Sequence, residues 1–320
     1  MSLTTQADPA LAARLKAALF GMIGSFVLFA AYLAIPPIGI FSGILAPFPA
    51  AFNRLVHGRL TACILTLGVT AATTALFGIF AGALYLGMCA VIGLIMPELL
   101  ARGLSGSRTL FWTTAANLTV LFAAVVLYSL STGIDLRQVI SAEITSSMTQ
   151  AAALYEKSGV QGEDLDLVKR SMKTASDMLL RLYPAMITLM YVIMAGCNLA
   201  LLKKTTPVTG ISLNVAEFSS FKNPDLLVWL LIATGFSLLL PAAVVTTPAL
   251  NILLLLALLY FIQGMAVVSV LISRQSFSGM LRIGLYVMLV IQPYLVVLIA
   301  GIGLCDLWVD FRTPKKQENL

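Results

Sequence analysis

The chain has 320 residues, of which 59% are hydrophobic and only 11% are charged. Soluble domains carry about 25% charged residues, so this composition excludes an ordinary soluble protein and indicates an integral membrane protein with many spans. The formal net charge is +6. The sequence shows no basic runs with interleaved aromatic residues, the pattern that nucleic-acid binding requires, so a nucleic-acid partner is not expected.

A helix needs about 20 apolar residues to cross the lipid bilayer. The apolar runs between breaking residues predict an all-α, polytopic transmembrane helix bundle of about nine spans, with eight as the alternative. The expected spans are 15–35, closed by Pro36 and Pro37, then 38–54, 60–78, 80–100, 109–131, 179–202, 225–245, 248–272 and 280–304. Residues 37–53, interrupted by Pro47 and Pro49, are the segment that would only half cross in the eight-span alternative.

One polar stretch interrupts the apolar runs. Residues 133–178 are rich in charged and hydroxyl side chains, carry apolar residues at helical spacing, and contain a break at Gly159 and Gly162. They predict an extramembrane helical hairpin whose second arm continues into the span at 179–202. The sequence therefore divides into a membrane block (1–132), the hairpin (133–178), a second membrane block (179–304) and a short polar tail (305–320).

The short-loop cations set the expected orientation. In a nine-span chain they all fall on one side of the membrane, and cytoplasmic loops are the ones enriched in Lys and Arg. These cations are Arg14 and Lys16, Arg54 and Arg59, Arg102 and Arg108, Lys203 and Lys204, and Arg274 and Arg282. We therefore expect a multi-pass protein of the bacterial cytoplasmic (inner) membrane with its N-terminus in the cytoplasm.

Polar residues inside apolar spans are candidates for ligand binding. Gln263 and Gln292 each lie mid-span beside a helix-loosening residue, Gly264 or Pro293, and Gly264 also permits a close backbone approach. The candidate ligand-binding residues are Gln263, Tyr260, Gln292, Tyr294, Asn117 and Asn198. The alternative for each amide is a hydrogen bond between helices, worth about 0.6 kcal/mol on average.

Two charged groups lie at the ends of expected spans. The segment "GLCDLWVDFR" (303–312) carries Asp306, Trp308, Asp310 and Arg312. The segment predicts either an interfacial anchor, because Trp favours the headgroup layer, or a cluster that binds a ligand or a partner. Glu98 lies four residues before Arg102, so it either pairs with that arginine on the helix surface or relays protons as a buried carboxylate.

No catalytic constellation is visible. His57 is the only histidine, and none of the four cysteines forms a CxxC pair. A metal site usually needs three or four ligands, and nucleotide-binding motifs are lacking. The sequence therefore predicts no enzyme, no catalytic residue, no metal and no cofactor.

Five stretches, in order along the chain, resemble the YybS-like family of bacterial polytopic membrane proteins, a domain of unknown function. They are "FNRLVHGRLTACIL" (52–65), "LYPAMITLMYVIMAGCNLALLKK" (182–204), "FSSFKNPDLLVWLL" (218–231), "YFIQGMAVVSVLI" (260–272) and "GLCDLWVDFR" (303–312).

This family is distantly similar to the substrate-capture subunits of energy-coupling-factor transporters. The resemblance implies a small-molecule ligand, a membrane coupling subunit with an ATPase as partners, and a small-residue docking face at Ala30 and Ala34. The sequence departs from compact capture subunits in having more spans and the insert at 133–178. The alternative function is a non-catalytic membrane scaffold or regulatory protein of the cell envelope that uses the hairpin as a partner surface.

Overall fold

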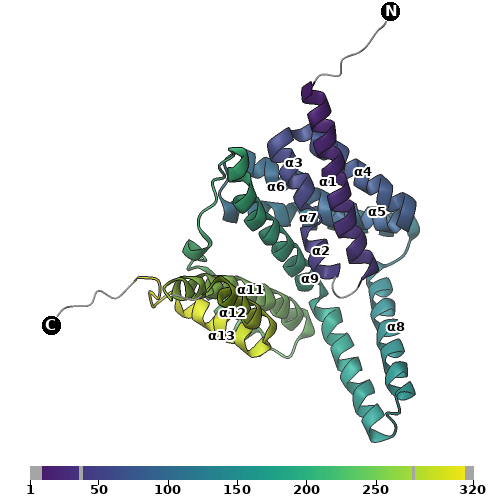
Figure 1. The fold of residues 1–320 in the computed structure, drawn as a ribbon. Coiled ribbons are helices and arrows are strands. Elements are labelled where there is room, and N and C mark those ends of the chain that lie inside the picture. The colour runs from purple at the N-terminus through teal and green to yellow at the C-terminus, as the bar shows by residue number, and fades with distance from the viewer. Residues whose placement is uncertain (1–8, 36–38, 276–277, 314–320) are drawn as a thin grey trace, which may run out of the picture. The chain divides into compact units, whose positions relative to one another are not determined.

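The computed structural model describes residues 9–35, 39–275 and 278–313, and these ranges contain helices but no β-strand (Figure 1). The prediction of an all-α, polytopic fold is therefore confirmed. By its internal contacts the chain forms two compact units. The first comprises Met1–Leu136 and Met190–Val215, and the second comprises Arg137–Leu189 and Ala216–Leu320.

Helices α1 to α7 belong to the first unit. They are α1 (Pro9–Ala34), α2 (Gly39–Leu45), α3 (Phe48–His57), α4 (Arg59–Phe77), α5 (Ile79–Tyr85), α6 (Val91–Ala101) and α7 (Gly106–Thr132), with a π-helical turn (Leu86–Ala90) joining α5 to α6. The first five expected spans each correspond to a helix, or a pair of helices, long and apolar enough to cross a membrane. The pair α2 and α3 is one of these, and the closing prolines Pro36 and Pro37 lie outside the described residues.

The break between α2 and α3 is stabilised by side chains from other helices. A helix end leaves carbonyl groups without partners, and lipid offers no water to hydrogen-bond to them. Ser25 donates from its hydroxyl to the carbonyl of Ala46 at 2.7 Å, and Asn198 donates from Nδ2 to the carbonyl of Ile44 at 2.7 Å. The Tyr85 hydroxyl lies 2.8 Å from the Ser25 hydroxyl. Buried polar side chains therefore stabilise a proline-broken span.

The polar stretch forms the predicted hairpin. Helix α8 (Leu136–Lys157) and the first part of α9 (Glu163–Thr205) run antiparallel in Figure 1. Gly159 and Gly162 form the turn with φ values of +91° and +66°, which favour glycine. Helix α9 is one continuous helix of 43 residues, so the hairpin's second arm does continue into the expected span. The place of the hairpin outside the lipid stays a prediction.

Two expected spans of the second unit are not continuous helices. Residues 225–245 contain α10 (Leu227–Ser237) and the first three residues of α11 (Ala243–Ser273). At about 1.5 Å per residue α10 is too short to cross about 30 Å of hydrocarbon. The expected span 280–304 is broken at Gln292 into α12 (Gly279–Ile291) and α13 (Pro293–Cys305), bent by 97°.

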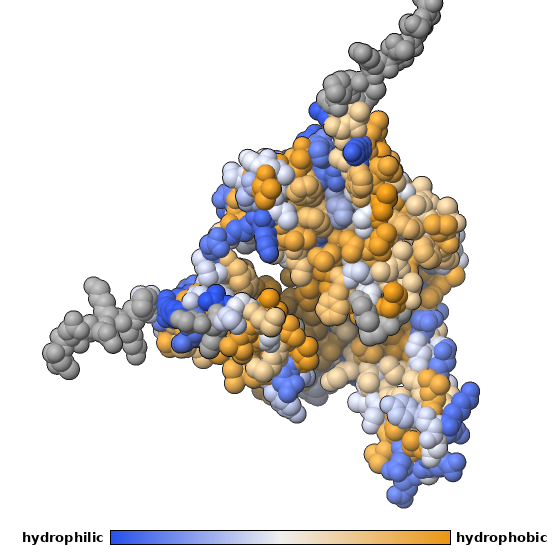
Figure 2. Space-filling model, viewed as in Figure 1, coloured by the Kyte–Doolittle hydropathy of each residue, from blue (hydrophilic) through white to orange (hydrophobic). Residues whose placement is uncertain are grey.

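The number of spans is therefore closer to the alternative of eight than to nine. Within the described ranges, seven helices are long and apolar enough to cross, or eight if α12 and α13 are counted as one span. The seventh is α11 (Ala243–Ser273). Figure 2 shows apolar side chains over much of the surface of α1 and of its neighbours in the first unit, and a more hydrophilic end on the hairpin.

An asparagine inserts into the backbone of α9 near a proline. Asn251 of α11 donates from Nδ2 to the carbonyl of Arg181 at 2.7 Å, and its Oδ1 accepts from the N–H of Ala185 at 2.9 Å. A regular helix would pair those two backbone groups with each other. Pro184 lies between them, and a proline ring opens the helical turn that precedes it. The carboxamide therefore completes the hydrogen bonding of α9 and joins it to α11.

Helices α11 and α13 pack closely because each presents a glycine to the other's backbone. A Cβ on Gly264 would overlap the carbonyl of Ile299, and a Cβ on Gly303 would overlap the carbonyl of Tyr260. Tyr260 lies against Gly303 and Gly264 lies against Ile299, so residue numbers rise along α11 while they fall along α13. The two helices are therefore antiparallel. Gly264 was expected from the sequence to allow such a close approach, and that expectation is confirmed.

Replacing Gly303 by alanine should force α11 and α13 apart. We expect a loss of stability of about 1–3 kcal/mol or more, typical of overpacking, measured as a lower midpoint of thermal unfolding in detergent. Gly301→Ala is the matched control, because no atom outside its own helix lies within 4 Å of a Cβ there. Equal midpoints for the two variants would contradict this packing.

Candidate functional site

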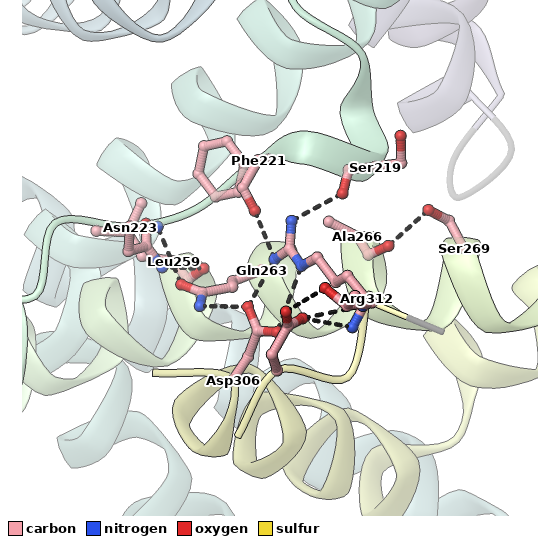
Figure 3. Close-up of polar contacts among 11 residues, drawn as sticks. Ser219, Phe221, Asn223, Leu259, Gln263, Ala266, Ser269, Asp306 and Arg312 are labelled. Atoms are coloured by element: carbon pink, nitrogen blue, oxygen red, sulfur yellow. Dashed lines mark hydrogen bonds and ion pairs between the residues drawn. The ribbon is translucent and has the colours of Figure 1, made fainter. Parts of the chain in front are cut away.

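The closing segment "GLCDLWVDFR" contains a buried ion pair, and it contacts α11 through a hydrogen bond from Gln263 to Asp306 (Figure 3). Arg312 donates from Nη2 to Asp306 Oδ2 at 2.7 Å and from Nε to Oδ1 at 3.3 Å. It also donates to the carbonyls of Ser219 and Phe221, at 2.7 and 2.8 Å. The side chains of Asp306 and Arg312 are only 3% and 18% exposed. The pair therefore fastens the loop after α9 and the end of α13 to each other.

Gln263 of α11 belongs to the same network. Its Nε2 donates to Asp306 Oδ2 at 2.9 Å, and its Oε1 accepts from the N–H of Asn223 at 3.0 Å. Asn223 in turn donates from Nδ2 to the carbonyl of Leu259 at 2.8 Å. The carboxamide of Gln263 is fully buried and has partners at both polar atoms, which is the interhelical alternative left open by the sequence.

Of the other expected ligand residues of the second unit, Tyr260 lies about one turn before Gln263 on α11, but Gln292 and Tyr294 are not gathered around it. Tyr260 is buried, and its hydroxyl has no hydrogen-bond partner. Gln292 is exposed at the break before α13, and Tyr294 is 85% exposed. Gln292 lies seven residues before Ile299, the residue that abuts Gly264. Along the axis of α13 it is therefore about 10 Å away from that contact.

The remaining residues of the closing segment lie at the surface. Trp308 is 69% exposed, as suits an interfacial anchor. The pKa of Asp310 is lowered because the Thr313 hydroxyl and the backbone N–H groups of Arg312 and Thr313 donate to its carboxylate. In the first unit, Ala30 is half-buried and Ala34 is exposed. The anchoring and docking roles of these residues stay predictions.

The carboxylate of Glu98 forms ion pairs with three arginines in the first unit. It pairs with Arg102 at 3.4 Å, as its spacing predicted, but it also binds Arg54 and Arg59. The two arginines flank the turn between α3 and α4, about 40 residues earlier in the chain. Their contact with α6 could not be read from local spacing, although the motif "NRLVHGR" (53–59) showed that both lie beside one turn.

Helix α7 buries a face made of polar and small residues. Its buried residues are Gly106, Thr109, Thr113, Thr114 and Asn117. Apolar side chains occupy the opposite face, with Phe111 and Phe122 66% and 70% exposed. This is the reverse of a helix in a soluble protein, and it is typical of a membrane helix that lines a polar interior.

The buried polar side chains of α7 have oxygens without hydrogen-bond partners. The oxygens concerned are Oγ1 of Thr109, Thr113 and Thr114 and Oδ1 of Asn117. By contrast Thr119, which is exposed on the same helix, donates to the carbonyl of Ala115 at 2.8 Å. Thr109, Thr113 and Asn117 follow one another at intervals of four residues, so they share one face of the helix.

Asn198 of α9 adds another such oxygen to the first unit. Its Nδ2 donates to the carbonyls of Ile44 and Met194, both at 2.7 Å, and its Oδ1 has no partner. The two expected ligand-binding residues of the first unit, Asn117 and Asn198, therefore combine full burial with a free acceptor. The threonines of α7 were missed by sequence reasoning, although their four-residue spacing in "TLFWTTAAN" (109–117) was the available signal.

Comparison with known proteins identifies the family. The model of the family described as "Predicted membrane protein (DUF2232)" matches residues 25–307. The chain belongs to this family. No curated protein and no solved structure matches the chain. Among the described residues, no group of three or more His, Cys, Asp or Glu side chains could hold a metal ion.

The buried ion pair of this DUF2232 member gives a direct test of its C-terminal network. Asp306→Asn should lower stability by about 3–5 kcal/mol, because it leaves Arg312 partly buried without its counter-charge. The measurement is the thermal unfolding midpoint of the purified protein. Asp310→Asn removes the same charge from an exposed carboxylate and should cause little change. A small effect of both substitutions would show that the network does not stabilise the fold.

Proposed function

We propose that this protein binds a small polar solute against the inner face of α7. It would act as the substrate-binding subunit of a transporter whose energy comes from a separate ATPase. One observation carries the proposal, namely the row of buried α7 side chains whose oxygens have no partner within the protein. Intramembrane polar groups of this kind mark substrate and ion pathways in membrane proteins.

The magnitude of the cost supports a ligand. A buried polar group without a partner costs about 1–3 kcal/mol, whereas a whole domain is stable by only about 5–15 kcal/mol. Four such groups on one helix face are therefore expensive unless a solute or water satisfies them. Side chains that served packing alone could be replaced by apolar ones at no loss.

The chemistry of the free atoms restricts the solute. Asn117 uses its amide nitrogen on a backbone carbonyl, so its carboxamide oxygen remains, which can only accept. The threonine hydroxyls can accept or donate. The face therefore suits a compound with several N–H or O–H donors, such as an amine, an amide or a polyol.

The sequence resemblance supports the same class of function. The YybS-like stretches imply a distant similarity to substrate-capture subunits, which bind a small molecule and rely on a coupling subunit and an ATPase. The docking face expected for such a partner contains Ala30 and Ala34, of which Ala34 is exposed. The orientation with the N-terminus in the cytoplasm belongs to this proposal.

A membrane scaffold is the second candidate, and a different observation favours it. Gln263, the first residue expected to bind a ligand, instead bonds to Asn223 and Asp306 of the protein itself. The hairpin exposes apolar side chains, among them Leu154 and Leu167, which are 63% and 61% exposed. A scaffold would lose its partner proteins on deletion of the hairpin while its membrane helices stayed folded.

Thr113→Val separates the two candidates. Valine has nearly the shape of threonine but no hydroxyl, so the substitution removes a buried group that lacks a partner. We expect the stability of the purified protein to stay the same or rise, and the co-purifying small molecule, detected by native mass spectrometry, to be lost. Thr119→Val, on the exposed side of the same helix, is the control and should retain it.

Two results would count against a solute site on α7. One is a small molecule retained equally by wild type, Thr113→Val and Asn117→Leu. The other is a wild-type protein that carries no small molecule and co-purifies with envelope proteins through its hairpin. The second result would support the scaffold.

A further inference from the structure

The arginines around Glu98 form a second polar site in the first unit, separate from the inner face of α7. Arg54 lies in the last turn of α3, Arg59 begins α4, and Arg102 follows the last residue of α6. All three contact the carboxylate of Glu98. Three guanidinium groups against one carboxylate leave a local charge of +2, because arginine is always protonated.

Glu98 cannot satisfy these arginines. Its Oε2 accepts from Arg54 and from Arg59 Nε, and its Oε1 accepts from Arg59 Nη2 and Arg102. A carboxylate offers about four lone-pair positions, and each guanidinium carries five N–H donors. The carboxylate is therefore filled while most of the donors stay free. The side chains of Arg59 and Arg102 are 71% and 65% exposed, so their donors are accessible to a further anion.

A cavity adjoins these donors. It has a volume of about 390 Å³, and its charged side consists of the three arginines and Glu98. The remaining wall is formed by Cys63, Leu94, Ile95 and Leu99. Leu94 and Ile95 lie about one turn before Glu98 on α6, and Cys63 lies about one turn after Arg59 on α4. The cavity is therefore charged where the helices end and apolar where they continue into the span.

We propose that this cavity binds a phosphate group, carried by an anionic phospholipid. Guanidinium groups match the geometry of phosphate oxygens, and the apolar wall gives an acyl chain a surface that a free phosphate ion would leave unused. Basic pockets between membrane helices bind anionic headgroups by the same combination of contacts. A phosphate site here does not require a solute on α7, so this proposal is independent of the proposed transport function.

The test uses the full chain in detergent and native mass spectrometry. Phosphatidylglycerol and phosphatidylcholine with identical acyl chains are titrated separately, and inorganic phosphate is titrated in a third arm. We expect wild type to retain phosphatidylglycerol in preference to phosphatidylcholine. The double variant Arg59→Gln and Arg102→Gln should weaken that retention at least about tenfold, because two charge-assisted contacts are lost.

Arg14→Gln with Arg108→Gln is the matched control. It removes two charges from exposed arginines of the same unit that do not line the cavity, and it should leave the retention unchanged. Glu98→Gln gives a second measurement in the opposite direction. Removing the competing carboxylate should strengthen phosphate binding, so the proposal remains testable even if the arginine variant is poorly folded.

Each outcome decides the proposal. Selective retention of phosphatidylglycerol that depends on Arg59 and Arg102 supports it. Inorganic phosphate bound through the same arginines, without preference between the two lipids, overturns the lipid source and leaves a free anion as the ligand. Equal retention of both lipids by wild type and by both double variants, with no binding of inorganic phosphate, overturns the site altogether.

Discussion

Every backbone N–H and C=O within lipid must find a partner in the protein, because no water is available there. Side chains meet this requirement at two breaks that the structure describes, one caused by proline and one by a π-helical turn. Asn198 and Ser25 satisfy carbonyls at the break between α2 and α3. Tyr191 donates to the carbonyl of Gly87 within the π-helical turn, at 3.2 Å. Buried polar side chains are therefore mainly a means of allowing irregular backbone inside an apolar bundle.

That use of polar side chains makes the exceptions informative. Gln263 and Asn223 join α11 to the loop after α9 by hydrogen bonds, and Asp306 and Arg312 belong to the same network. The buried threonines of α7 join nothing. One polar cluster thus joins elements of the second unit, while the oxygens of the other have no partner in the protein. The arginines around Glu98 are intermediate between these two clusters. They have a partner in Glu98, but one carboxylate occupies only part of their hydrogen-bonding capacity.

Local patterns predicted the features that depend on neighbouring residues in the sequence. The first five spans, the hairpin with its glycine turn and the close approach at Gly264 all follow from runs and spacing. Span counting failed at 225–245 because hydropathy measures composition, whereas crossing requires an unbroken helix, and α10 has only 11 residues. The hydrogen bonds of Gln263 could not be predicted from the sequence, because its partners Asn223 and Asp306 lie 40 and 43 residues away. The polar face of α7 shows in the four-residue spacing of Thr109, Thr113 and Asn117, but threonine is also compatible with an ordinary apolar span, because its hydroxyl can bond within its own helix.

The insertion of Asn251 beside Pro184 has an evolutionary consequence. The carboxamide of Asn251 is useful only where the backbone of α9 is open, and the opened backbone is tolerable only with a carboxamide to fill it. Neither residue can then change freely without the other. Within the DUF2232 family the two positions should covary, and relatives without the proline should also lack the asparagine. An alignment in which either residue varied independently would show that the two are not coupled.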